Sequence, residues 1–182
     1  MRGVSLTSDW TWTRATASSV DAAAKTVSWN CEPGSDYWRT TASGVVSHNG
    51  HALLHPADGD FALSAEFAAP LSERYDQCGL ILIENETKWF KTSFERDGDI
   101  FVGGVATSGT SDWSRSPTDR LTSLKVVRQG TTVEVYVHEA EAIWSLMRQL
   151  TMAGHLQVGL YSAAPTGAGF VTCASDVELS LG

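Results

Sequence analysis

Cysteine is scarce in this chain, and its placement excludes one class of protein. The 182 residues contain only 3 cysteines, Cys31, Cys78 and Cys173, which are odd in number and include no CxxC pair. A small secreted domain held together by disulfides has an even number of cysteines at closer spacing. We therefore expect buried, reduced thiols.

Basic residues and long apolar runs are also lacking. There are 13 Lys and Arg against 21 Asp and Glu, a net charge of -8, and no basic cluster occurs along the chain. Nucleic acid and anionic membrane surfaces are therefore not expected as partners. No stretch has the apolar length of a membrane span, and the first ten residues do not resemble a signal peptide. The default expectation is a cytoplasmic location.

The chain does contain many short alternating runs of apolar and polar residues. Residues 61–67 and 132–138 are examples, and this period of two is typical of half-buried strands. Asn49-Gly50, Asp97-Gly98 and Gln129-Gly130 separate such runs, as hairpin turns do.

Length and composition predict one domain. With 182 residues, 42% of them hydrophobic, the chain can bury one core. We predict a single all-β domain over residues 1–182, a jelly-roll sandwich of two antiparallel sheets. Residues 107–120 are expected to form a long surface loop, and residues 141–150 a short helix, a loop or an edge strand.

The segment Trp89–Glu95 is the best candidate for a site. Alternation places Phe90 and Phe94 on one face, and Trp89, Lys91, Ser93 and Glu95 on the other. An aromatic ring, a cation and a carboxylate at steps of about 6.6 Å suit a sugar or another small polar ligand. The alternative is a solvated sheet face with a Lys-Glu ion pair.

Two catalytic arrangements remain open. Glu66 could join Glu95 as the carboxylate pair of a glycoside hydrolase, but the compact Glu-x-Asp-x-x-Glu strand of similar glucanases is absent. His48, His51 and His55 give only a weak metal signal, because His51 and His55 would lie roughly 13 Å apart on an extended strand. We predict no metal and no cofactor, and a single histidine could still serve as acid or base.

The seven tryptophans fall into two groups by their neighbours. Those beside polar residues are expected to be partly exposed: Trp38, Trp89, Trp113 and Trp144. Those expected to pack at the edge of the core are Trp10, Trp12 and Trp29.

Six motifs together resemble a known family. They are Asp36–Thr41, Asn49–His51, Tyr75–Leu80, Trp89–Glu95, Ser111–Ser114 and Trp144–Arg148. In this order they resemble the concanavalin A-like domain of unknown function that includes the YesU-type bacterial proteins and the yeast regulator of enolase. The resemblance covers nearly the whole chain and agrees with the predicted sandwich.

The resemblance implies a groove on a concave sheet face but no particular reaction. The ligand-binding residues it implies are Trp38, Asp76, Gln77, Trp89, Asp112, Trp113 and Arg148, and the candidates for chemistry are Glu95, His51 and Lys91. Bacterial members often accompany carbohydrate-utilisation genes, and the yeast member is tied to regulation of a glycolytic enzyme. The chain departs from the family pattern at Ala42, where many members have a histidine, and at Ala140-Glu141, which replaces an Asp-Gly turn.

Three hypotheses follow. The leading one is a domain that binds a sugar or a small polar ligand on the concave face. The second is an enzyme on a sugar or a specialised metabolite, with Glu95 or His51 as general acid or base and Lys91 as electrostatic support. The third is an interaction or regulatory domain whose exposed tryptophans contact another protein. A homodimer is left open.

Overall fold

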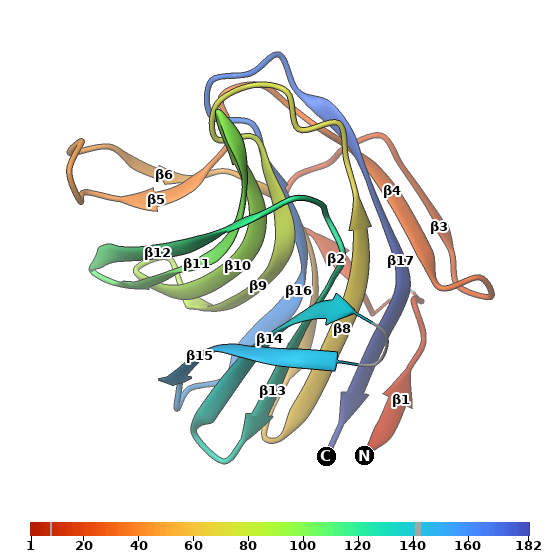
Figure 1. The fold of residues 1–182 in the computed structure, drawn as a ribbon. Coiled ribbons are helices and arrows are strands. Elements are labelled where there is room, and N and C mark those ends of the chain that lie inside the picture. The colour runs from red at the N-terminus through yellow and green to blue at the C-terminus, as the bar shows by residue number, and fades with distance from the viewer. Residues whose placement is uncertain (8, 141–142) are drawn as a thin grey trace.

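The structure is a computed structural model that describes residues 1–7, 9–140 and 143–182, and every regular element in these ranges is a β-strand. Two large antiparallel sheets form a sandwich, and a two-stranded hairpin stands apart from both (Figure 1). The predicted all-β sandwich is therefore confirmed. Alternating side chains give each strand one face for the core and one for other contacts.

Sheet A has eight strands in the order β15-β14-β13-β8-β17-β4-β3, with β1 also paired to β17. The strands are β1 (Arg2–Val4), β3 (Ser18–Asp21), β4 (Thr26–Cys31), β8 (Phe61–Ala68), β13 (Ser123–Gln129), β14 (Thr132–Ala140), β15 (Ile143–Thr151) and β17 (Phe170–Leu181). Because β1 pairs with the end of β17, the two chain ends lie side by side (Figure 1).

Sheet B has seven strands in the order β12-β11-β10-β9-β16-β7-β2. They are β2 (Thr11–Trp12), β7 (His51–Ala57), β9 (Gln77–Asn85), β10 (Lys88–Asp97), β11 (Asp99–Ser108), β12 (Thr110–Thr118) and β16 (Leu156–Ala163). The separate hairpin consists of β5 (Tyr37–Arg39) and β6 (Val46–His48). Figure 1 shows β9 to β12 as strongly curved strands, with this hairpin beside them.

The core lies between the inner faces of the two sheets, meaning the faces that point toward each other. Phe61 and Phe67 of sheet A and Phe90 and Phe94 of sheet B are all buried there, as their alternation predicts. Trp29 is also buried, and its Nε1 donates to Ser162 Oγ at 2.7 Å across the sandwich. This bond satisfies the one polar atom that the indole brings into the core.

Two turn predictions are confirmed and one is wrong. Asp97-Gly98 and Gln129-Gly130 join paired strands, with φ values of 77° and 59° at the glycines. Asn49-Gly50 instead links the hairpin to β7, and Gly50 does not have a positive φ. A glycine is needed there because a Cβ atom would collide with the ring of Tyr37.

The loop predicted for residues 107–120 is wrong, because Thr110–Thr118 forms β12. Apart from Trp113 and Pro117, its side chains are polar on both faces, as suits an edge strand that is largely exposed. Of the alternatives for residues 141–150, the edge strand is confirmed from Ile143 onward, while Glu141 and Ala142 lie outside the described residues.

All three cysteines are free. Cys31 and Cys78 are buried as predicted, whereas Cys173 is exposed, contrary to the expectation. Among the residues described, none belongs to a helix with the length and apolarity that a membrane span requires.

Candidate functional site

The polar residues of β10 lie in the middle of the outer face of sheet B, meaning the face that points away from sheet A. Because the alternate residues of this strand are in the core, the outer side chains are Trp89, Lys91, Ser93 and Glu95. Glu95 stands opposite Gln77 of β9. The predicted division of this segment between two faces is confirmed.

The β5–β6 hairpin covers one end of this row. Tyr37 is buried, with its ring centroid 5.9 Å from that of Trp89 and 6.1 Å from that of Tyr161. At the sheet edge, Thr41 Oγ1 donates to the backbone oxygen of Ser111 at 2.6 Å. The hairpin therefore packs on the outer face, and Trp89 is only 1% exposed beneath it.

Lys91 is the centre of a buried polar network. Its Nζ donates to Gln77 Oε1 at 2.7 Å and to Asp36 Oδ1 at 3.1 Å. The hydroxyl of Tyr161 donates to the same Gln77 oxygen at 3.0 Å. Nζ also lies 5.9 Å from the ring centroid of Trp89 and 5.8 Å from that of Tyr161. One carboxylate, one amide and two aromatic faces thus stabilise an ammonium group that is 2% exposed.

A glycine beside Ser93 allows this network to form. Lys91 of β10 and Gln77 of β9 lie two rows apart on the sheet, and the row between them pairs Ser93 with Gly79. The long side chains can meet above this row because Gly79 carries no side chain. A Cβ atom at Gly79 would in addition collide with the backbone of β10.

Glu95 combines burial with a raised pKa. Its side chain is buried, and within the described part of the chain its Oε1 has no hydrogen-bond partner. Burial raises the pKa of Glu95 from 4.5 to about 7, against the attraction of Lys91, which lowers it. A carboxyl group with this pKa can either donate or accept a proton at neutral pH.

Aromatic side chains stand at the rim of the site. Trp113 is 38% exposed and contacts Trp38 and Tyr75 edge-on, at centroid distances of 6.3 and 6.5 Å. Arg115 stacks on Trp113 with 4.7 Å between its guanidinium carbon and the ring centroid. Trp113 shares a row with Lys91 two strands away, a separation of about 10 Å.

The predicted residues that this site brings together are Trp38, Gln77, Trp89, Lys91, Glu95 and Trp113. Trp89 differs from the expectation of partial exposure, because Tyr37 covers it. Asp36, Tyr161 and Arg115 were not among the predicted site residues. Asp36 stands two residues before Trp38 in the motif Asp36–Thr41, whereas Tyr161 belongs to a mostly apolar strand that gives no polar signal.

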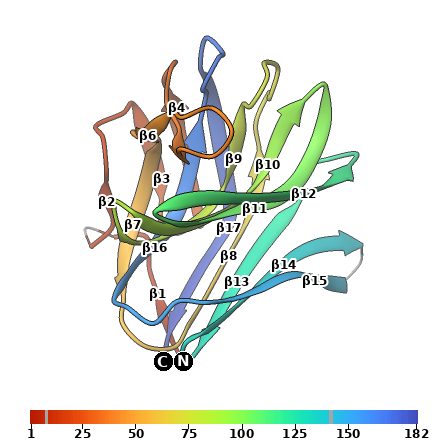
Figure 2. The same ribbon diagram turned by 90° about the vertical axis from the view of Figure 1, so that its left-hand side faces the viewer.

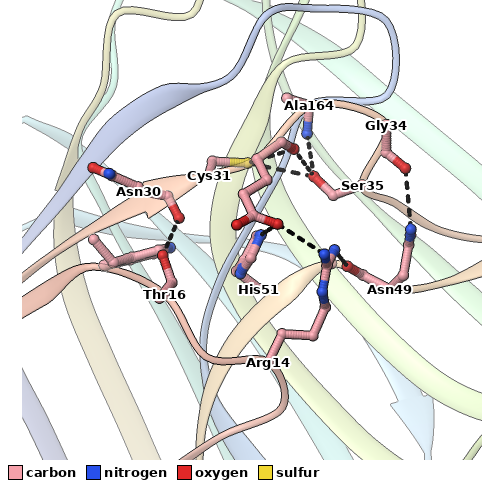
Figure 3. Close-up of polar contacts among 12 residues, drawn as sticks. Arg14, Thr16, Asn30, Cys31, Gly34, Ser35, Asn49, His51 and Ala164 are labelled. Atoms are coloured by element: carbon pink, nitrogen blue, oxygen red, sulfur yellow. Dashed lines mark hydrogen bonds and ion pairs between the residues drawn. The ribbon is translucent and has the colours of Figure 1, made fainter.

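His51 is not part of this site. Its neighbour Ala52 occupies the outer face, so His51 points inward and is fully buried (Figure 3). Its Nε2 lies 3.7 Å from Glu32 Oε2, which also accepts from Arg14 at 2.8 Å. Burial and then Arg14 lower the pKa of His51, while Glu32 raises it. The neutral imidazole is thus separated from Glu95 by sheet B.

Asp112, Arg148 and Asp76 are also placed elsewhere. Arg148 and Asp112 lie at the edge of the sandwich, where Arg148 donates to Ser114 Oγ at 3.1 Å and approaches Asp112 Oδ1 at 3.8 Å. Asp76 accepts from the backbone N–H groups of residues 72–73 at 3.2 and 2.9 Å. Asp76 therefore holds the turn before β9.

The carboxylate pair suggested for glycoside hydrolysis is not formed. Glu66 lies on the outer face of sheet A, so the whole sandwich separates it from Glu95. Over the described ranges, there is also no group of three or more His, Cys, Asp and Glu side chains arranged to hold a metal ion.

A family model and several known proteins are similar to this chain. The family model "Protein of unknown function (DUF1349)" matches residues 12–181. "Regulation of enolase protein 1" of Saccharomyces cerevisiae is 26% identical over 179 residues, which is 95% of this chain and 90% of the yeast protein. A crystal structure of a functionally unknown protein from Saccharomyces cerevisiae superposes with a TM-score of 0.87 at 24% identity, covering 96% of this chain and 97% of that one.

More distant solved structures share the fold alone. The GH43 protein BlXynB of Bacillus licheniformis, as a K247S mutant, matches with a TM-score of 0.67 at 11% identity, over 86% of this chain and 33% of that one. The exoplasmic/lumenal domain of VIP36, in its Ca2+/Man3GlcNAc-bound form, matches with a TM-score of 0.52 at 9% identity, over 94% and 83% of the two chains. The sandwich is thus of the jelly-roll, lectin-like kind.

Proposed function

We propose that this chain, which belongs to the DUF1349 family of proteins of unknown function, binds a sugar-like small polar ligand on the outer face of sheet B. The observation that carries the proposal is the buried network of Lys91 and Gln77, next to the Glu95 carboxyl group, whose Oε1 is unpartnered among the described residues, and on the same face as the exposed ring of Trp113. A ligand with several hydroxyl groups matches this mixture of donors, acceptors and an aromatic face.

Unused hydrogen-bonding capacity favours a ligand over a purely structural role. Lys91 has three donor hydrogens and makes two hydrogen bonds to described residues, and Glu95 Oε1 makes none. Buried polar groups are costly when they lack partners. A polyhydroxyl compound that displaced the side chains covering these buried groups would supply those partners.

The similarity in fold also supports a sugar-like ligand. The VIP36 domain is described in a form bound to Man3GlcNAc, and the GH43 protein is named for a glycoside hydrolase family. For the present chain these likenesses concern the fold, so the ligand class rests on the side chains of the site.

The test is a thermal-shift screen of neutral sugars, sugar acids and other polar metabolites, followed by calorimetry on each hit. Trp113→Ala removes an exposed ring and is expected to weaken binding about tenfold while the fold is kept. Lys91→Met should abolish binding. Lys88→Met is the matched control, because Lys88 lies on the same strand but pairs with Glu84 at 2.8 Å. Absence of any hit, or a hit that survives both site variants, contradicts the proposal.

A second candidate function is acid–base catalysis on such a ligand, favoured by the pKa of about 7 at Glu95. Glu95→Gln keeps the size of the side chain but cannot transfer a proton. Once a ligand is identified, we expect this variant to bind the ligand but not to convert it. NMR spectroscopy of the ligand measures the turnover. Equal turnover in the parent and the variant would exclude Glu95 as the acid or base.

A further inference from the structure

A cleft lies at the edge of the sandwich where β12 and β15 end their sheets. Its volume is about 720 Å³, and it opens between the inner faces of β11 and β12 on one side and β14 and β15 on the other. Figure 2 shows the two sheets diverging toward this edge. A volume between about 300 and 1,000 Å³ is typical of small-molecule sites.

The cleft exists because the core stops one strand short of the edge. Its floor contains the apolar core residues Phe90, Val102, Val135 and Val137. The inward positions of β12, by contrast, are all polar, and they are Asp112, Ser114, Ser116 and Thr118. These short polar side chains cannot extend the core. The cleft therefore has an apolar floor and a polar entrance.

A β-bulge brings a cation to this floor. The pairing of β14 with β15 shifts register between Val135 and Tyr136, so that Leu146 and Arg148 stand opposite successive residues and Met147 is the extra one. Met147 packs against the core, and Arg148 lines the cleft beside it. Bulges re-aim side chains in this way and recur next to functional sites.

The guanidinium group of Arg148 is only loosely held. It lies 5.9 Å from the ring centroid of Phe90, donates to Ser114 Oγ at 3.1 Å and approaches Asp112 Oδ1 only to 3.8 Å. The Asp112 side chain is 76% exposed, so a competing anion can displace it. A guanidinium has five donors in a planar fork that matches a carboxylate.

The other charged residues of the cleft are engaged or lie at its rim. Arg115 pairs with Asp97 at 2.8 Å, and Arg120 donates to the backbone oxygen of Glu139 at 2.7 Å. The side chains of Asp119 and Glu139 are exposed. Arg148 is therefore the cation that contacts the apolar floor.

We propose that this cleft binds a small amphipathic carboxylate, with the apolar body on the Phe90 floor and the carboxylate paired to Arg148. The proposal is independent of the outer-face site, because Phe90 and Arg148 lie on the inner side of the sheets. Apolar contact supplies the affinity, and the guanidinium selects the anionic head group.

The test measures binding of decanoate, decanol and decylamine below their micelle concentrations by calorimetry, with amide NMR shifts to locate the site. Decanoate is expected to bind most tightly and decylamine most weakly, with shifts concentrated in β11, β12, β14 and β15. Arg148→Gln should weaken decanoate about tenfold or more and leave decanol unchanged. Ser116→Trp, which places a large ring in the cleft from an exposed position of β12, should abolish binding of both.

Arg14→Gln is the matched control, because it removes a guanidinium from the far side of the molecule and should leave decanoate binding intact. Near-ultraviolet circular dichroism and thermal melting verify that each variant is folded. The proposal is overturned if decanoate binds no better than decanol, if Arg148→Gln binds it as tightly as the parent, or if neither compound binds. Binding that survives Ser116→Trp would place the ligand elsewhere and is equally decisive against the cleft.

Discussion

Glu95 should make the stability of this protein fall as the pH rises through neutrality. Its pKa is 4.5 in an ordinary setting and about 7 in the fold, so the folded state binds a proton that the unfolded state has released. The stabilisation is complete below pH 4.5 and is lost as the pH rises to about 7. A difference of about 2.5 pKa units corresponds to roughly 3 kcal/mol.

The perturbation that isolates this effect is Glu95→Gln, because glutamine has the size of the protonated acid and does not ionise. The assay is urea unfolding of parent and variant at pH values from about 4 to about 8. The free energy of unfolding of the variant, relative to the parent, should rise by roughly 3 kcal/mol between pH 4.5 and about 7 and then level off.

Histidines act in the opposite sense and cancel in this difference. Burial lowers the pKa of His48 and of His51 below 6.5, so their contribution to stability is lost as the pH falls below that value. The parent and the Glu95→Gln variant share this histidine contribution, so it does not affect the difference between them. Glu66→Gln, at an exposed position on the outer face of sheet A, is the control and should not change the profile. A difference between parent and Glu95→Gln that is constant with pH would refute the reasoning.

Three further predictions concern stability and are checked by urea or thermal unfolding. Tyr37→Ala should cost about 3 to 5 kcal/mol, because the ring fixes the hairpin on the outer face and its hydroxyl donates to the backbone of Gly50 at 3.0 Å. Asp76→Ala should cost about 2 kcal/mol through the loss of two backbone hydrogen bonds, and should leave the core signal in near-ultraviolet circular dichroism unchanged. Trp29→Phe should cost about 2 kcal/mol, because Ser162 Oγ loses its donor inside the core.

The sequence predicts which side chains of β10 lie on which face of the sheet, because the strand geometry alone determines this. Successive side chains of a strand point to opposite faces, so Phe90 in the core implies Lys91 on the outer face. Their partners on neighbouring strands depend on the register, which a single sequence does not reveal. The contact of Lys91 with Gln77 across the row of Gly79 is of this kind.

The misplaced residues have three separate physical causes. The orientation of His51 is set by the pairing of β7 with β16, which places its side chain in the core. The inner and outer positions of β12 cannot be told apart by polarity, so Asp112 gives no sign of its direction. The direction of Arg148 depends on a bulge, and one extra residue reverses every side chain beyond it.

The two proposed sites lie in the same half of the molecule for a common reason. On the outer face, the β7–β16 half is apolar and closed by the hairpin, with residues such as Leu54 and Tyr161 buried there. In the β10–β12 half, the core ends before the sheet does, and the edge strand is exposed. Polar side chains there lack a full set of hydrogen-bond partners among the described residues. β10 serves both sites, because it presents Phe90 to the cleft and the adjacent Lys91 to the outer face. Arg115 also contacts both sites, because it lines the cleft and stacks on Trp113 at the rim of the outer face, so coupling between two bound ligands would pass through this side chain or through the backbone of β10.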